Sequence, residues 1–265
     1  MINSRPKIGL ALGGGAAKGY AHIGILKVLE KEGIPIDMIA GTSIGSVVGA
    51  LYASGISISV IEKLAYNIQR DLWIDLVIPR RGFIEGKRVE EMMKLLTKNK
   101  SFDELEIPLA ITATDLIEGE EYIFNKGNVA KAVRASISIP GIFNPVIEGK
   151  KVLVDGGVLN NVPVDVVKQM GADYVIAVDL SSKVSVKVRS IYDILNRTFE
   201  VMGREILKYK MQTPDVLIRP NLEKINPSRF NQAEECIEEG IRATLEVLPK
   251  IRELGRKVKR EKIQE

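Results

Sequence analysis

The stretch 36–54, IDMIAGTSIGSVVGALYAS, decides the fold of this chain. It starts with an apolar run over 36–40, which predicts a strand, and ends in small and apolar residues typical of a helix. Between the two lies Gly41-Thr42-Ser43-Ile44-Gly45, a Gly-x-Ser-x-Gly turn. This pattern predicts a strained turn that exposes the Ser43 hydroxyl at the end of the strand, where a nucleophile could sit. A plain glycine-rich turn with a solvated serine is the alternative.

The two glycines of this turn have a steric role in the first interpretation. Gly41 and Gly45 lack a Cβ atom, so the strand and the helix can approach each other closely. The N–H group of Ile44, which follows the serine, would then point at the group that the serine attacks. The sequence therefore places a candidate nucleophile and one candidate hydrogen-bond donor in the same turn.

The segments around this turn alternate between strand and helix patterns. A strand is expected over 7–12, a glycine-rich loop over 13–19 and a helix over 20–31. This alternation predicts a three-layer α/β fold, with a mainly parallel central sheet and helices on both faces. Further strands are expected at 107–113, 122–124, 144–147, 152–154, 173–178 and 215–218, and helices at 59–73, 89–96, 129–136, 163–170, 191–211, 231–247 and beyond Pro249.

Two details of this expectation concern helix ends and domain boundaries. The sequence Ser59-Val60-Ile61-Glu62 has the pattern of a capping box that opens the helix 59–73. No linker or internal repeat interrupts the chain, so we expect one domain over 1–265, including the C-terminal helices from about residue 189.

The composition is that of an ordinary globular protein, with 45% hydrophobic and 27% charged residues among 265. No apolar run reaches the ~18 residues of a membrane span, and the first residues lack the pattern of a signal peptide. Cys236 is the only cysteine, so an internal disulfide framework is excluded. These features together predict a cytoplasmic protein.

The net charge of +4 comes entirely from the C-terminal tail. Residues 250–265 carry seven Lys or Arg and three Glu, so the rest of the chain is neutral overall. The chain has no basic bias of the kind that indicates nucleic-acid binding. The tail could contact anionic lipid at a membrane surface, or it could be a solvated helix end, where basic residues suit the helix dipole.

A serine nucleophile needs a base, and the usual histidine is poorly placed in this chain. His22 is the only histidine and lies among apolar residues of the first helix, which predicts a structural hydrogen-bonding role. The carboxylate candidate is Asp155, which follows an apolar strand and precedes Gly156 and Gly157. An aspartate at a strand's carboxyl end lies where α/β proteins bind ligands. The alternative for Asp155 is an ordinary Asp-Gly turn.

A glycine-rich loop, Gly13-Gly14-Gly15, enters the first helix. Such a loop presents backbone N–H groups that could hold an oxyanion or a phosphate. A P-loop is excluded because Lys18 is followed by Gly19 and by no Ser or Thr. The glycine spacing also departs from the dinucleotide-binding pattern, and Gly41-Thr42-Ser43 stands where that pattern requires an acid. These departures oppose a nucleotide-binding oxidoreductase.

Four motifs together resemble the bacterial patatin-like phospholipases. They are GGGAAKG at 13–19, GTSIG at 41–45, ASISIP at 135–140 and DGG at 155–157, in the order of that family. The resemblance covers 7–179, about two thirds of the chain. It implies a catalytic dyad of Ser43 and Asp155, without histidine, that hydrolyses acyl esters of lipids and uses no metal or cofactor.

The same resemblance implies roles for the residues around the dyad. The backbone N–H groups of Gly14, Gly15 and Ile44 would form the oxyanion hole. The supporting motif residues are Gly13, Lys18, Gly19, Gly41, Gly45, Gly156 and Gly157. Lys18 could steady the loop, meet a headgroup phosphate or be solvated.

Three alternatives remain open at this stage. An acyltransferase or thioesterase would use the same dyad, and a non-catalytic regulator could keep the fold to bind acyl groups or partner proteins. The apolar faces of 59–73 and 89–96 could line an acyl channel or could pack in the core. The region after Arg189 carries no motif, and the sequence does not predict the oligomeric state.

Overall fold

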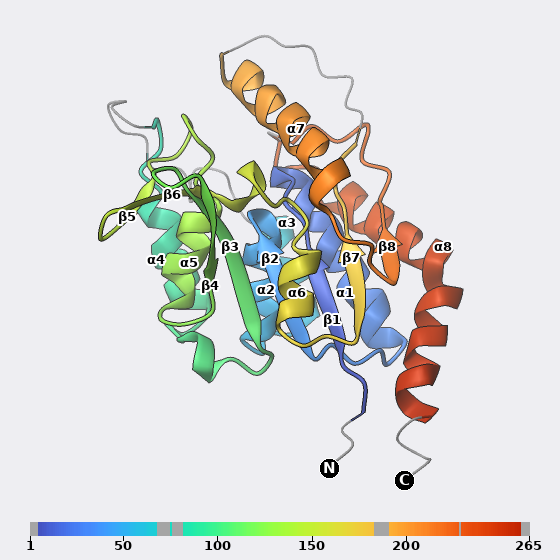
Figure 1. The fold of residues 1–265 in the computed structure, drawn as a ribbon. Coiled ribbons are helices and arrows are strands. Elements are labelled where there is room, and N and C mark those ends of the chain that lie inside the picture. The colour runs from blue at the N-terminus through green and yellow to red at the C-terminus, as the bar shows by residue number, and fades with distance from the viewer. Residues whose placement is uncertain (1–4, 68–74, 76–81, 183–190, 228, 261–265) are drawn as a thin grey trace.

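The computed structural model describes residues 5–67, 75, 82–182, 191–227 and 229–260. Figure 1 shows a central twisted sheet with helices packed on both of its faces. The sheet has the order β5-β6-β3-β2-β1-β7-β8, and β4 pairs with β3. The strands are β1 Ile8–Leu12, β2 Met38–Thr42, β3 Leu109–Asp115, β4 Glu120–Phe124, β5 Val146–Glu148, β6 Lys151–Asp155, β7 Tyr174–Val178 and β8 Val216–Ile218.

The middle of the sheet is parallel, from β3 through β2, β1 and β7 to β8. All five residues of β1 are buried, as expected for a central strand covered on both faces. β4, β5 and β6 are antiparallel additions at the β3 end. The sheet is therefore mixed but mostly parallel, which confirms the predicted fold class.

The helices form two layers around the sheet (Figure 1). One large core lies between one face of the sheet and the layer that contains α1, α2, α5 and α8. A smaller core lies on the other face, against α6 and the end of α7. The helices are α1 Ala21–Lys31, α2 Ile44–Ala53, α3 Ile58–Asn67, α4 Lys87–Leu96, α5 Val129–Ser136, α6 Val164–Gln169, α7 Ile191–Lys210 and α8 Ala233–Arg260.

The edge of β3 brings two distant segments together. β2 pairs with the first part of β3 and ends at Thr42, which lies opposite Thr112. β6 then pairs with the rest of the same edge, and its last residue, Asp155, lies opposite Ala113. β2 and β6 run in opposite directions along this edge, so their carboxyl ends meet. Ser43, which follows β2, and Asp155, which ends β6, therefore lie next to each other.

Several predicted element boundaries differ from the structure by about two residues, and two of the differences have a clear physical cause. β2 lies two residues later than expected, because the Asp37 carboxylate pairs with Arg5 and accepts the N–H of Ile8 before the strand begins. α3 begins at Ile58, and the Ser57 carbonyl accepts the N–H groups of Val60 and Ile61. The predicted capping box at Ser59 is therefore wrong. The part of this predicted helix from 68 to 73 lies outside the described residues.

The C-terminal helix is longer than expected. The sequence predicts two helices separated near Pro249, but α8 is one helix that contains this proline. A proline inside a helix removes one hydrogen bond, so packing must compensate. α8 lies tightly against α1: a Cβ atom at Gly240 would come within 2.1 Å of the Ala21 carbonyl oxygen. Ile251 and Leu254, after the proline, remain buried in the main core.

Candidate active site

Ser43 occupies the sharp turn between β2 and α2. Its backbone has φ 52° and ψ −125°, a left-handed conformation that a non-glycine residue rarely adopts. Its N–H group donates a hydrogen bond to the Ser136 hydroxyl at 2.8 Å, and its carbonyl accepts one from the Ser46 hydroxyl at 2.6 Å. These bonds hold the strained turn in place, as an elbow requires.

Gly41 and Gly45 are glycines for steric reasons. A Cβ atom on Gly41 would lie 2.7 Å from the Gly45 carbonyl oxygen, and one on Gly45 would lie 2.2 Å from the Leu12 carbonyl oxygen. Neither distance is possible for a real side chain, so any larger residue would push α2 away from the sheet. The predicted close approach of strand and helix is confirmed.

Asp155 meets Ser43 at the end of β6. The Ser43 hydroxyl donates a hydrogen bond of 2.6 Å to Oδ2 of Asp155, and the N–H of Gly157 donates one of 2.8 Å to Oδ1. Both side chains lie at the floor of a cavity, and both residues are less than 8% exposed. The next residue, Gly156, has no room for a side chain, since its Cβ would lie 2.3 Å from the Thr112 hydroxyl.

The environment of Asp155 makes its carboxylate more basic. Burial raises the pKa of Asp155 to about 6, while the hydrogen bonds from Ser43 and Gly157 act in the opposite direction. A charged carboxylate is costly where water is excluded, so the proton is held more tightly than in solution. At neutral pH the carboxylate is still largely ionised, and it can accept a proton from the serine hydroxyl.

The ASISIP segment supports both members of this pair. Ser136 accepts the Ser43 N–H, and the Ser138 carbonyl accepts the Asp155 N–H at 2.9 Å. The Arg134 side chain is buried and donates to the Ser138 hydroxyl at 2.6 Å. One short segment therefore anchors the nucleophile turn and the aspartate at once, a role that the sequence motif did not reveal.

The glycine loop lies beside the Ser43 turn, but only part of it is available to a ligand. The Gly14 N–H donates to the Asn161 carbonyl at 3.0 Å, and the Gly13 N–H donates to the Val178 carbonyl. The expectation of a free N–H at Gly14 is therefore wrong, because Asn161, in the segment between the 3₁₀ turn Gly156–Val158 and α6, accepts a hydrogen bond from this group. Within the described part of the chain, the N–H groups of Gly15 and Ile44 have no hydrogen-bond partner.

His22 holds the glycine loop in place through a buried hydrogen bond to Gly13. Its Nε2 atom lies 2.8 Å from the Gly13 carbonyl oxygen, and since a carbonyl can only accept, Nε2 carries the proton. The ring is completely buried, and burial lowers the pKa of His22 to about 4, so the imidazole is neutral. The structural hydrogen-bonding role predicted from the sequence is confirmed.

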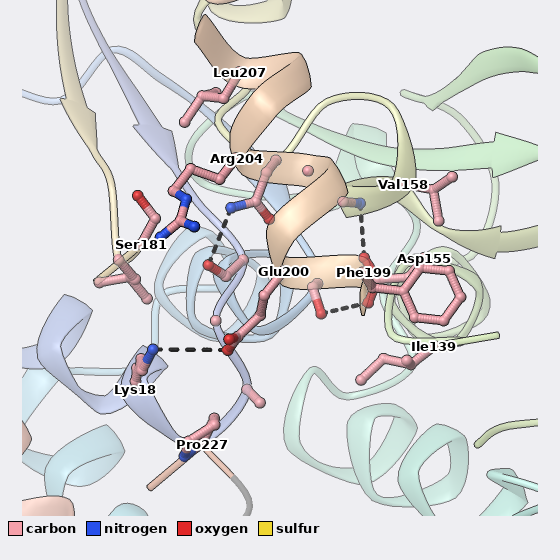
Figure 2. Close-up of a pocket in the computed structure, with 18 of the residues that line it drawn as sticks. Lys18, Ile139, Asp155, Val158, Ser181, Phe199, Glu200, Arg204, Leu207 and Pro227 are labelled. Atoms are coloured by element: carbon pink, nitrogen blue, oxygen red, sulfur yellow. Dashed lines mark hydrogen bonds and ion pairs between the residues drawn. The ribbon is translucent and has the colours of Figure 1, made fainter. Parts of the chain in front are cut away.

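Lys18 and Gly19 pack the loop against its neighbours. A Cβ atom on Gly19 would lie 2.1 Å from the Ile44 side chain, so the 3₁₀ turn Ala16–Tyr20 and the elbow fit together only with glycine there. Lys18 is 2% exposed, and its ammonium group lies 3.7 Å from the Glu200 carboxylate of α7. A solvated Lys18, one of the three predicted alternatives, is therefore wrong. Figure 2 shows this ion pair across the cavity.

Ser43 lies between two cavities of different character. One, of about 130 Å³, is lined by the glycine loop, Asp155 and polar residues of α7. The other, of about 180 Å³, is lined almost entirely by apolar side chains, including Ile61 of α3 and Val89 of α4. The predicted apolar faces of these helices do line a cavity next to the candidate nucleophile. The α7 contribution was missed because its Arg and Glu residues belong to no motif.

The described residues hold no cluster of three or more His, Cys, Asp or Glu that could bind a metal ion. None of the helices described is long and apolar enough to cross a membrane. The polar groups that line the cavity beside Ser43 include Asp155, the glycine loop, Asn161, Ser181, Ser182 and the charged side chains of Lys18 and α7.

Comparison with known proteins places these features in a family. The chain is 35% identical over 184 residues to patatin-like phospholipase domain-containing protein 6 of Mus musculus, a match that covers 66% of this chain and 14% of that protein. It is 36% identical over 187 residues to lysophospholipase NTE1 of Debaryomyces hansenii, covering 68% of this chain and 12% of that protein. The chain therefore spans only a small part of the length of these relatives.

A solved structure and a family model agree with this match. The fold resembles VipD from Legionella pneumophila with a TM-score of 0.69 and 14% identity, covering 92% of this chain and 67% of that one. At this identity the likeness concerns the fold alone. The family model for patatin-like phospholipases matches residues 10–168, which include the elbow, the glycine loop and Asp155. This chain belongs to the patatin-like phospholipase family.

Proposed function

We propose that this protein is a lipid acyl hydrolase in which Ser43 and Asp155 form the catalytic dyad. The observation that carries the proposal is the 2.6 Å hydrogen bond from the Ser43 hydroxyl to the Asp155 carboxylate, made by a serine in a strained turn. A nucleophile and base within hydrogen-bonding distance are the signature of an activated serine. The relatives that are named phospholipase or lysophospholipase support a lipid ester as the substrate.

In the proposed reaction, Ser43 attacks the ester carbonyl carbon while Asp155 accepts its proton. The negative charge on the tetrahedral intermediate is stabilised by the N–H groups of Gly15 and Ile44, which have no other partner among the described residues. Asp155 then gives the proton to the leaving alcohol, and an acyl-enzyme remains. Asp155 next accepts a proton from water, whose oxygen attacks the acyl carbon of the acyl-enzyme. Asp155 then returns this proton to the Ser43 oxygen as the fatty acid leaves, which restores the dyad.

The two cavities suggest how the substrate lies. We propose that the acyl chain enters the apolar cavity lined by α3 and α4, and that the alcohol part enters the polar cavity below α7. Binding of an apolar chain lowers the free energy in proportion to the apolar area that it buries. The glycine loop and Ser43 contact both cavities, which suits a scissile ester at their junction.

Two wider features of the protein remain proposals of the same kind. We propose a single domain over 1–265, supported by the close packing of α8 on α1, and a cytoplasmic location, which a lone buried cysteine suits. Peripheral contact with a lipid surface would serve a lipid substrate. The helix α7, which lines the polar cavity with other residues, also carries exposed apolar side chains: Ile194, Val201, Met202 and Tyr209.

The test is active-site labelling followed by turnover measurements. We expect a fluorophosphonate probe to label Ser43, as mapped by mass spectrometry, and Asp155→Asn to prevent labelling. Hydrolysis of p-nitrophenyl esters should fall about 10⁴-fold or more in Ser43→Ala, with Ser59→Ala, an exposed serine of α3 that lines neither cavity, as the control. Unchanged hydrolysis in a folded Ser43→Ala protein would overturn the proposal.

A further inference from the structure

Lys18 presents an unusual group to the polar cavity. The residue is 2% exposed, yet the nearest acid, Glu200, lies 3.7 Å from its ammonium nitrogen, which is longer than a hydrogen bond. An ammonium group has three N–H donors, and among the described residues Glu200 is the acid that the structure gives them, in one long contact. Burial disfavours the charged form and lowers the pKa of Lys18, while Glu200 acts in the opposite direction. The site is therefore built for a ligand that supplies more acceptors than Glu200 does.

Glu200 is shared between two cations that come from different parts of the chain. Its Oε1 atom faces Lys18 of the glycine loop, while Oε2 accepts a hydrogen bond of 2.9 Å from Arg197, one turn earlier on α7. Figure 2 shows the Glu200 side chain reaching from α7 to Lys18, with Arg204 on the next turn of the helix. A carboxylate between two cations marks a place where an anion is stable.

The remaining charges of the cavity favour an anion as well. Lys18, Arg197 and Arg204 line it, against Glu200 and the Asp155 carboxylate, which already accepts hydrogen bonds from Ser43 and Gly157. The Ser182 hydroxyl lines the same cavity and has no hydrogen-bond partner among the described residues. The wall opposite the dyad thus offers more donors and positive charge than its own acid can satisfy.

We propose that Lys18 and Arg197 bind the phosphate group of a lysophospholipid headgroup, and that Glu200 occupies this site until the substrate displaces it. The inference rests on the proposed hydrolase function, because it places the phosphate beside the ester that Ser43 attacks. Phosphate oxygens match the planar donors of a guanidinium and offer Lys18 the acceptors that it lacks. The carboxylate of Glu200 stands in for two of these oxygens in the free protein.

The proposal gives opposite effects for two neighbouring residues of α7. Removing the charge of Arg197 takes away a ligand of the phosphate. Removing the charge of Glu200 takes away its competitor, so binding becomes tighter. A clamp that only holds α7 over the cavity would respond differently, since Arg197→Gln and Glu200→Gln would then both loosen it.

The first experiment measures binding without turnover. In a Ser43→Ala protein, calorimetric titration with glycerophosphocholine should give a dissociation constant about tenfold weaker for Arg197→Gln and severalfold tighter for Glu200→Gln. The matched controls are Arg242→Gln and Glu239→Gln, an ion pair with the same spacing on α8, away from the cavity. We expect no change in either control. Equal weakening by both α7 variants, or no effect of either, would overturn the proposal.

The second experiment separates a lipid headgroup from free phosphate. Wild-type protein and the α7 variants are compared on a lysophosphatidylcholine and on a monoacylglycerol with the same acyl chain. Arg197→Gln should lower kcat/KM about tenfold for the lysophospholipid only, and Glu200→Gln should lower its KM. Tight binding of inorganic phosphate without any preference for the lysophospholipid would contradict the headgroup assignment. Failure of the hydrolase function itself would appear as no turnover of either ester, and the titration would still report on the site.

Discussion

The Ser43–Asp155 pair and the Lys18–Glu200 pair lie in walls of one cavity but are held in different ways. The first spans 2.6 Å and joins residues at the ends of two strands, and the N–H groups of both residues donate hydrogen bonds to the ASISIP segment. The second spans 3.7 Å and joins a buried lysine to a half-buried glutamate on α7. The dyad is thus preorganised by the sheet, while the ion pair depends on two long side chains. The difference separates groups proposed to do chemistry from groups proposed to select a ligand.

The largest effect is expected from a substitution that removes the base of the Ser43–Asp155 pair. Asp155→Asn keeps the shape of the side chain but cannot accept the serine proton, so we expect kcat/KM for p-nitrophenyl esters to fall about 10³-fold or more. Activity is compared per folded molecule, with circular dichroism for each variant. Full activity in folded Asp155→Asn would mean that another group is the base.

The same substitution should stabilise the fold at neutral pH. The pKa of Asp155 is about 6 in the folded protein against 3.8 ordinarily, so the folded state binds this proton more tightly than the unfolded state. The group's contribution to the free energy of unfolding therefore falls as the pH rises from about 4 to about 6. We expect Asp155→Asn to be about 3 kcal/mol more stable than wild type at pH 7, with the gain vanishing near pH 4. Denaturant titrations at both pH values test this.

The pH dependence of activity tests whether the buried Asp155 carboxylate is the base. A carboxylate base must be ionised, so kcat/KM should rise with pH and level off above a midpoint near 6, set by the pKa of Asp155. Below the midpoint we expect about a tenfold loss for each pH unit. Esters with different leaving groups serve as the control for a change of rate-limiting step. A midpoint near 4 would instead match an unperturbed aspartate.

A smaller effect is expected in the glycine loop. A Cβ atom on Gly15 would lie 3.0 Å from the Leu180 side chain, so Gly15→Ala should shift the loop slightly and misplace the Gly15 N–H. Because the oxyanion exists only along the reaction path, kcat should fall by roughly 10- to 100-fold while KM changes little. Gly49→Ala, in α2 and away from the cavity, is the control. A pure KM effect would assign the loop to substrate binding.

The smallest effect on activity is expected at His22. The neutral ring only donates to the Gly13 carbonyl, so His22→Asn should keep activity within about threefold. Losing the buried hydrogen bond between His22 and Gly13 should cost about 1–3 kcal/mol of stability, seen as a lower melting temperature. If folded His22→Asn were inactive while Asp155→Asn remained active, the imidazole would be the base and the dyad would be wrong.

Much of the fold could be predicted because its signals are local. The apolar runs of β1 and β7 and the helical spacing of α1 depend on neighbouring residues alone, and the structure has these elements where they were expected. The predictions fail where tertiary packing outweighs a local signal. Pro249 predicts a break, but α8 continues through it because it is packed along α1. Tertiary burial outweighed a local propensity there.

The candidate site divides in the same way. The Gly-x-Ser-x-Gly pattern by itself determined the elbow, because steric exclusion around Gly41 and Gly45 and the strain at Ser43 act within five residues. Family motifs pointed to Asp155, but only the antiparallel register of β6 on β3 decided that its carboxylate meets Ser43, 112 residues away in the chain. The tertiary structure also decided that Asn161 takes the Gly14 N–H and that Glu200 of α7 reaches Lys18. Such contacts follow from how distant elements pack, and no local pattern encodes them.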